Sequence, residues 1–184
     1  MILQNSLFPP ESSWTVPDVF PQFSETETVA IDLETYDPHL MTCGPGWATG
    51  RGHVVGIGVA TKDWEGYFPI RHEGGGNLDE GMVLRWLTKL LSSTKREVVF
   101  HNALYDVGWL RREGVIVKGK ILDTIIAAPL INENRFSYSL DNLGAAYCDE
   151  KKDESLLQDA ALAFGINPKS EMYKLHAKYV GPYG

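Results

Sequence analysis

Residues 29–35, Val-Ala-Ile-Asp-Leu-Glu-Thr, constrain the fold of this chain more than any other stretch. Two acids, Asp32 and Glu34, stand two positions apart among apolar residues, so on a strand both carboxylates point to the same face. Such charges repel each other and lose hydration, which is costly unless something compensates them. Hard oxygen ligands suit Mg2+ or Mn2+. The stretch therefore predicts a buried strand that carries a metal site; the alternative is a strand that ends at Asp32 with its acids in water.

A second polar pair, Asn102 and Asp106, follows directly on a short apolar run at residues 98–100. The two residues are four positions apart, so on a helix they share a face. Asn102 is expected to cap this helix at the sheet edge, with Asp106 one turn further and pointing across a cleft. The alternative is an ordinary capped helix with an acid favourably placed in its first turn.

The order of apolar patterns along the chain predicts the fold class. Strands are expected at residues 28–34, 53–60, 67–70, 98–100 and 120–122. Helices are expected at residues 78–91, from 102 onward, at 124–130, 138–146, 153–164 and 171–179. Three strands come first and strands then alternate with helices, which predicts an α/β domain with a mixed five-stranded sheet flanked by helices.

The remaining segments are expected to be arms and loops. Residues 1–27 are rich in Pro, Ser and Thr and predict an extended arm with a short helical turn near residues 17–23, ahead of one domain at 28–184. Residues 36–52 contain two prolines and four glycines and predict a long loop beside the acids, a candidate substrate flap. Within it, Trp47 and Arg51 could meet a base or phosphate, or Trp47 could pack on its own scaffold.

Composition narrows the classes of protein. A net charge of -7 argues against a protein that holds nucleic acid by bulk positive charge, although not against a nuclease whose metals need acids. Cys43 and Cys148 lie far apart, so we expect neither a disulfide framework nor structural zinc, and a reducing cytoplasm is the expected compartment. We see no signal peptide, no membrane span and no serine or cysteine nucleophile motif.

The ordered set of motifs resembles the DnaQ-like 3'-5' exonucleases, in particular the proofreading domain of phage and bacterial family A DNA polymerases. The resemblance runs from about residue 26 to the last residue, and the matching stretches are Asp32-Leu33-Glu34-Thr35, Asn102-x-x-x-Asp106, Asp123-Thr124 and Ser139-Leu140-Asp141-Asn142-Leu143. It implies a ribonuclease H-like fold. Asp123 precedes a helix start, so we interpret it as a cap and leave it outside the metal set.

The last motif of this family is a tyrosine followed by an aspartate four positions later. By the resemblance, Tyr183 is that tyrosine, and its partner aspartate would fall three residues beyond Gly184, the last residue given. Three of four expected carboxylates are then present, so we expect a truncated exonuclease domain whose metal occupancy and rate are in question. Whether the chain is a fragment, a split gene product or a shortened piece stays open.

The resemblance implies hydrolysis at a DNA 3' end with two divalent cations, Mg2+ or Mn2+, releasing nucleoside monophosphates. The family's roles, carried over by motif, make Asp32, Glu34 and Asp106 the metal ligands and Tyr183 the residue that orients the attacking water. Two residues, Thr35 and Asn102, would contact the terminal nucleotide. The expected partners are a single-stranded DNA 3' end and a polymerase domain or chain, in the cytoplasm of a bacterial or phage-infected cell, with no membrane.

Two alternatives stay open. The same tyrosine-type motifs occur in exoribonucleases resembling ribonuclease D. Lacking the fourth carboxylate, the chain could instead be an impaired module that binds single strands or docks on a polymerase. Four lysines are candidate contacts to a nucleic-acid backbone or plain solvated surface: Lys118, Lys120, Lys151 and Lys152. We assign no chemistry to the glycine run at residues 74–76, which lacks the Lys-Ser/Thr of a phosphate-binding loop.

Overall fold

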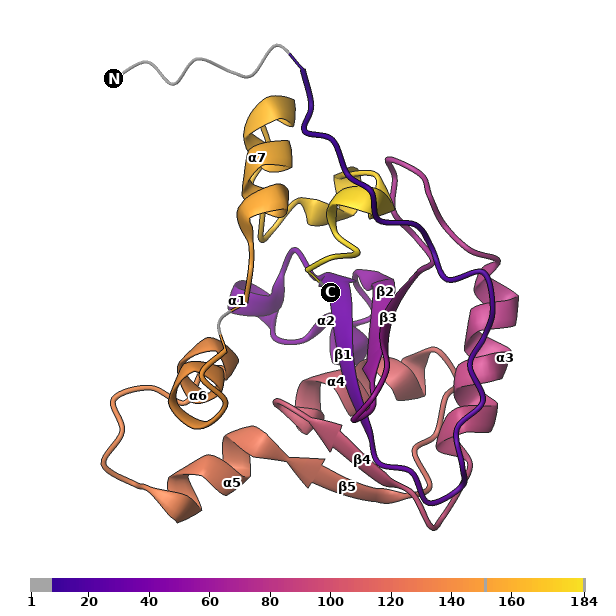
Figure 1. Ribbon diagram of the computed structural model, residues 1–184, viewed down its shortest axis with the longest axis vertical. Helices are drawn as coiled ribbons and strands as arrows, with labels where there is room; N and C mark the ends of the chain where they lie inside the picture. The colour runs from indigo at the N-terminus through magenta and orange to yellow at the C-terminus, as the bar shows by residue number, and fades with distance from the viewer. Residues whose placement is uncertain (1–7, 151, 184) are drawn as a thin grey trace.

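A five-stranded mixed sheet forms the framework of the computed structural model, which describes residues 8–150 and 152–183 (Figure 1). The order across the sheet is β3-β2-β1-β4-β5. β1 pairs antiparallel with β2 and parallel with β4; β2–β3 is antiparallel and β4–β5 parallel. The strands are β1 (Val29–Tyr36), β2 (His53–Ala60), β3 (Glu65–Pro69), β4 (Glu97–Phe100) and β5 (Lys120–Asp123).

Seven α-helices and two 3-10 turns lie around this sheet in the described part of the chain. Three helices are long enough to pack with a full stripe: α3 (Glu80–Leu91), α4 (Ala103–Arg112) and α7 (Ser155–Phe164). The others are α1 (Leu40–Cys43), α2 (Gly46–Thr49), α5 (Thr124–Ile131), α6 (Leu140–Tyr147), η1 (Met172–Lys174) and η2 (Ala177–Tyr179). None of the described helices is long and apolar enough to cross a membrane.

The main core lies between one face of the sheet and helices α3 and α4. Alternate residues of β1, namely Val29, Ile31 and Leu33, are buried there, while Ala30 and Asp32 on the other face are exposed. Helix α3 places Val83, Leu87 and Leu91 against them at helical spacing. One face of the central strand is thus committed to packing, which leaves the other face for the acids.

The predicted mixed sheet and its five strands are confirmed, each strand lying within two residues of its expected limits. Three expected elements are wrong. Residues 17–23 form no helical turn; this stretch runs extended along the molecule, because Phe20 stacks on Phe68 and the indole nitrogen of Trp86 donates to the Pro21 carbonyl. The predicted loop 36–52 contains the single-turn helices α1 and α2.

The helix expected at residues 171–179 is also wrong, since the segment forms the separate turns η1 and η2. Leu175 between them is extended, with ψ near 155°. The ring of His176 then caps η2 by accepting from the Lys178 amide. Contacts with the rest of the molecule break the helix here, although the local pattern of apolar residues favours one.

Arg96 binds the N-terminal arm to the rest of the molecule, and its substitution tests how much this attachment contributes to stability. Its buried guanidinium donates to the carbonyls of Leu90, Glu27 and Ser24, so replacing it leaves buried acceptors without a partner. We expect Arg96→Leu to lower the free energy of unfolding by about 3 kcal/mol, measured by urea denaturation. The control Arg85→Leu, on the exposed face of α3, is expected to change it by less than about 0.5 kcal/mol. Equal effects would contradict this account.

Candidate active site

The two acids of β1 lie on the face of the sheet that the main core leaves free. Each faces a glycine across the antiparallel pair with β2, Asp32 opposite Gly58 and Glu34 opposite Gly56. Cross-strand neighbours on one face lie close together, so the glycines leave room above the strand for other groups. Asp32 is exposed and lines a cleft, whereas Glu34 is half-buried.

Asp106 reaches the same region from the first turn of α4. It is only 3% exposed, and its pKa is raised to about 8, first by burial and then by the charges of Asp32, Glu34 and Asp123. The pKa of Glu34 is raised to about 7 by burial and by Asp32, against a lowering effect of Lys152. These mutual effects place the predicted carboxylates of β1 and α4 within electrostatic reach of one another.

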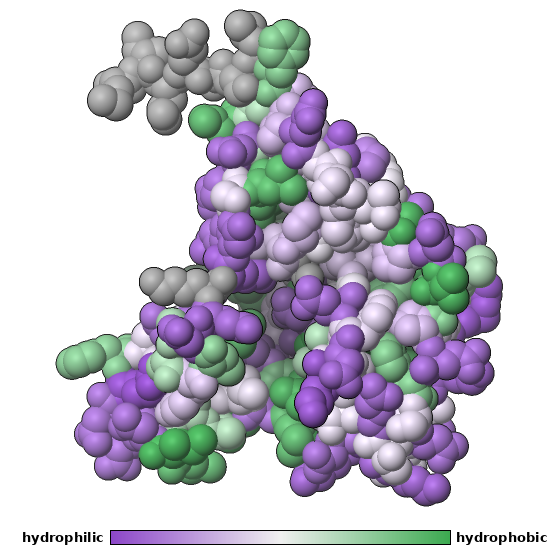
Figure 2. Space-filling model, viewed as in Figure 1, coloured by the Kyte–Doolittle hydropathy of each residue, from purple (hydrophilic) through white to green (hydrophobic). Residues whose placement is uncertain are grey.

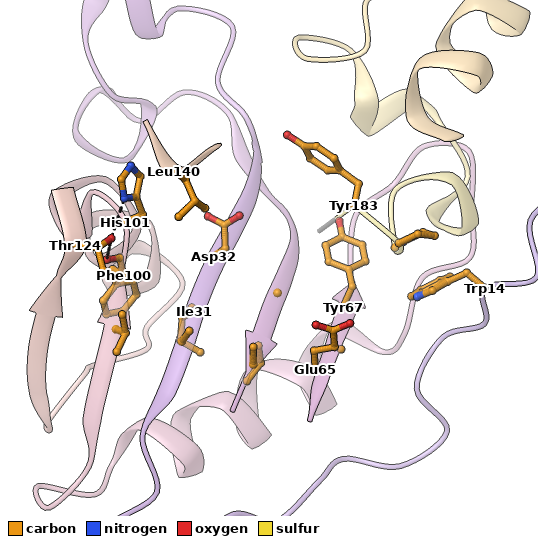
Figure 3. A pocket seen from close by; sticks show the side chains of 18 residues that line it. Trp14, Ile31, Asp32, Glu65, Tyr67, Phe100, His101, Thr124, Leu140 and Tyr183 are labelled. Carbon is orange, nitrogen blue, oxygen red and sulfur yellow. Dashed lines mark hydrogen bonds between the residues drawn. The ribbon is translucent and has the colours of Figure 1, made fainter. Parts of the chain in front are cut away.

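Tyr183 stands on the other side of the cleft, above Tyr67 (Figure 3). Burial is the main cause of its raised pKa, followed by the charge of Glu34, so its hydroxyl stays protonated at neutral pH. The ammonium of Lys152 lies 3.5 Å from the centroid of the Tyr183 ring. The predicted tyrosine therefore lies within electrostatic reach of Glu34.

Thr35 belongs to a hydrogen-bond network that the motifs did not reveal. The Tyr105 hydroxyl donates to Asp37 Oδ2 at 3.0 Å, so at 2.9 Å the Thr35 hydroxyl donates to the Tyr105 oxygen. The same Asp37 oxygen accepts from the amide of Gly46 at 2.8 Å. The network ties the end of β1 to α4 and to the segment beyond it. Tyr105 precedes Asp106 in the chain, but nothing in the sequence pairs it with Thr35.

Asn102 occupies the N-cap position of α4 as predicted, but its side chain does not cap the helix. It adopts a left-handed backbone, with φ near 78°, and its side chain is exposed. The cap comes from Asp123, whose carboxylate accepts from the amides of Asn102 and Ala103 and also from Ile125 at the start of α5. Asp123 is thus a cap, as predicted, and it serves two helices.

The candidate flap is held to α4 by packing. A Cβ on Gly108 would lie 2.4 Å from the Trp47 ring, so the indole lies directly on the helix backbone. Trp47 is partly buried against the main core, as the packing alternative expected. Arg51 donates to Cys43 within the same segment at 3.4 Å. Of the candidate lysines, Lys120 pairs with Glu97 at 2.9 Å, and Lys151 lies outside the described residues.

A cleft of about 540 Å3 opens over the acid face, and Figure 2 shows the surface hollowed between α5–α6 and the body of the molecule. Its walls come from far-apart parts of the chain. Residues that the motifs did not reveal are Trp14 from the arm, Tyr67 from β3 and His101 after β4, and Leu140 from the 139–143 motif joins them at the start of α6 (Figure 3). No local pattern in the sequence marks Trp14 or Tyr67 as cleft residues.

The carboxylate oxygens of Asp32, Glu34 and Asp106 are the kind of ligand that a divalent cation binds. The charge of Asp32 raises the pKa of Glu34, both charges raise the pKa of Asp106, and no described residue donates a hydrogen bond to these three carboxylates. Oxygen ligands with uncompensated charge are what Mg2+ and Mn2+ prefer. As they stand, no three acidic, histidine or cysteine side chains within residues 8–150 and 152–183 converge closely enough to enclose an ion. A bound cation would therefore have to draw the carboxylates together.

Comparison with known sequences follows the same motifs. The profile of a family described as 3'-5' exonuclease, of the DNA polymerase A type, matches residues 12–178. A DNA-directed DNA polymerase of Pseudomonas phage M6 is 40% identical over 190 residues, covering 98% of this chain and 28% of the polymerase. The DNA polymerase DpoZ of Salmonella phage PMBT28 is 30% identical over 149 residues, covering 80% of this chain and 21% of DpoZ. The chain thus spans less than a third of these relatives.

Solved structures show the same fold at low identity. NrnC of Brucella melitensis with bound Mg2+ superposes with a TM-score of 0.53 at 18% identity, over 77% of this chain and 67% of NrnC. The catalytic core of RRP6 from Trypanosoma brucei superposes with a TM-score of 0.52 at 20% identity, over 86% of this chain and 38% of that one. The sheet and its helices are those of the ribonuclease H-like fold, as the motifs predicted.

The carboxylate cluster makes a prediction about pH. Because the pKa of Asp106 is about 8 in the folded chain and near 4 in the unfolded one, the folded chain binds more protons between these values. In a chelator, the free energy of unfolding should therefore fall as pH rises from about 5 to 8. Asp106→Asn should flatten this slope, and Mg2+ should oppose it in the unsubstituted protein. A slope unchanged by Asp106→Asn, in urea denaturation at each pH, would contradict the cluster.

Proposed function

Since this chain belongs to the 3'-5' exonuclease family of DNA polymerase A type, we propose that it removes nucleotides one at a time from the 3' end of single-stranded DNA. The observation that carries the proposal is that Asp32, Glu34 and Asp106, from two elements, lie within electrostatic reach of one another beside a cleft, and none of them accepts a hydrogen bond from the described residues. A cleft of this size, open on one side, admits the end of a strand.

In this proposal the three carboxylates hold two divalent cations, Mg2+ or Mn2+. Such ions, when bound, would supply charge stabilisation to the attacking and leaving oxygens of a phosphodiester. Tyr183 keeps its proton at neutral pH and can hydrogen-bond the attacking water. Thr35 and Asn102 contact the terminal nucleotide: the Thr35 oxygen is held by Tyr105, and the exposed side-chain amide of Asn102 has no hydrogen bond within the described residues.

A single strand suits this cleft better than a duplex. The terminal base must separate from its partner before its phosphate can reach acids that lie at the sheet surface. The cleft wall carries the partly exposed aromatic rings of Trp14 and Tyr183, on which unpaired bases can be held without sequence readout. Bound cations supply the local positive field, which answers how a chain of net charge -7 accepts a polyanion.

We also propose that the chain works beside a polymerase domain. Both phage relatives are DNA polymerases in which the matched segment is a minor part of the length. An exonuclease that shares a chain or a complex with a polymerase receives the growing 3' end and can remove a mismatched nucleotide. The setting would then be the infected host cell.

The test is digestion of an end-labelled single strand with Mg2+ or Mn2+. We expect stepwise shortening of DNA that Asp32→Asn lowers about a hundredfold or more, because each ion contributes several kcal/mol to the transition state. The control Asp63→Asn, in the exposed turn between β2 and β3, should keep the rate. Faster shortening of the matched RNA strand would favour the exoribonuclease alternative. Retention of DNA without shortening would favour the binding module.

Tyr183 makes a separate prediction within the same assay. Tyr183→Phe removes only the hydroxyl, so we expect kcat to fall about tenfold to a hundredfold while the Kd for single-stranded DNA stays within about twofold. The dependence of kcat on pH near neutrality should be the same with and without the substitution, because the raised pKa keeps the Tyr183 hydroxyl protonated there. A rate equal to that of the unsubstituted protein would remove Tyr183 from the proposed machinery.

A further inference from the structure

Tyr183 is carried by a segment that meets the strands through Tyr67 and through Tyr36, whose ring centroid lies 4.3 Å from that of Tyr173. A second apolar cluster holds α7 and the turns η1 and η2 together, and its buried members are Tyr67, Leu157, Ala160, Met172, Leu175, Tyr179 and Val180. Among these, Tyr67 alone belongs to a strand. Of these two residues, Tyr67 is the one within the buried cluster, so the height of the segment above the acids depends in part on how Tyr67 is held.

His72 joins Tyr67 to this segment by two hydrogen bonds. Its Nε2 lies 2.8 Å from the Tyr67 hydroxyl, and its Nδ1 lies 3.1 Å from the carbonyl oxygen of Leu175. A carbonyl only accepts, so Nδ1 carries the proton. The ring is 3% exposed and burial lowers its pKa to about 4, so it is neutral at pH 7 and Nε2 accepts from Tyr67. The donor of each hydrogen bond is thereby determined: Tyr67 donates to His72, and His72 donates to the Leu175 carbonyl.

The glycine run at residues 74–76 forms a seat for the same segment. A Cβ on Gly74 would lie 2.3 Å from the His176 amide nitrogen, and one on Gly76 would lie 2.5 Å from the His176 ring. The Ala177 amide donates to the Gly75 carbonyl at 3.0 Å. Because glycine has no side chain, this run lets the two backbones come into contact. The glycines thus have a structural role, although they form no phosphate-binding loop.

The other end of this chain of contacts lies beneath the acids. A Cβ on Gly56 would lie 2.0 Å from the Tyr67 hydroxyl, and Gly56 is the cross-strand neighbour of Glu34. The charges of Glu34 and Asp32 add to burial in raising the pKa of Tyr67. Tyr67 thus lies between the acid pair and His72.

We propose that His72 is a positioning residue, which acts through Tyr67 and the Leu175 carbonyl to hold residues 172–183, and with them the Tyr183 hydroxyl, at a set height over Asp32 and Glu34. The inference rests on the role proposed above for Tyr183. It concerns residues outside the motif set, namely His72, Tyr67 and the glycine seat.

Kinetics on the full chain test this inference. Tyr67→Phe and His72→Asn each remove the bond between the two side chains, and we expect each to lower kcat about tenfold with KM within about twofold. Either change should have no further effect in a Tyr183→Phe background, because it acts through that hydroxyl. The control Thr88→Val removes a hydroxyl-to-carbonyl bond on α3, far from the cleft, and should leave kcat unchanged. Effects that multiply with Tyr183→Phe would overturn the positioning role.

Hydrogen exchange gives a readout that does not depend on hydrolysis. In His72→Leu, which removes both bonds, the amides of Tyr179, Val180 and Gly181 should exchange about tenfold faster, while those of α3 keep their rates. Unchanged exchange at residues 179–181 would overturn the inference. If the unsubstituted protein does not shorten DNA, the proposed function fails, and the exchange result alone then decides whether His72 seats the segment.

Discussion

Mutual repulsion among three neighbouring carboxylates, of which Asp106 is buried, Glu34 half-buried and Asp32 exposed, is the constraint on which the rest of the structure depends. The sheet commits one face of β1 to the core, and this leaves Asp32 and Glu34 on the other face, where Asp106 joins them from α4. Folding brings like charges together only if the surrounding contacts are strong enough to hold them. Stable packing of α3 and α4 therefore sustains an arrangement that is unfavourable until cations neutralise it.

Hydrogen-bond networks lie on both sides of this charged centre. Tyr105 and Asp37 hold the end of β1 and the segment beyond it, while Tyr67 and His72 hold the C-terminal segment. In each network a tyrosine hydroxyl donates to an acceptor, so neither brings a donor to the acids themselves. The carboxylates are thus positioned by their backbones and left free to bind something else.

The sequence predicted those features that depend on residues close together in the chain. Hydrophobic runs located the five strands, and the acid spacing on residues 29–35 placed both carboxylates on one face. Asp123 could be predicted as a cap because an acid just before a helix accepts hydrogen bonds from the first amides of that helix, which are its neighbours in the sequence. The helix expected at 171–179 failed because the seat at residues 74–76 and His176 decide its shape. The cap expected from the Asn102 side chain failed because a strand distant in sequence supplies it.

The arm contributes more than its composition suggests. Ser12 donates to the Lys178 carbonyl at 2.7 Å, and the Trp14 ring lies against Gly181, so the two ends of the described chain meet over the cleft. This contact spans 166 positions in the sequence. During synthesis, the acids of β1 leave the ribosome long before the wall opposite them exists. The wall of the cleft can form only after residues 178–183 have been synthesised. The site is therefore completed late, by contacts between residues far apart in the sequence.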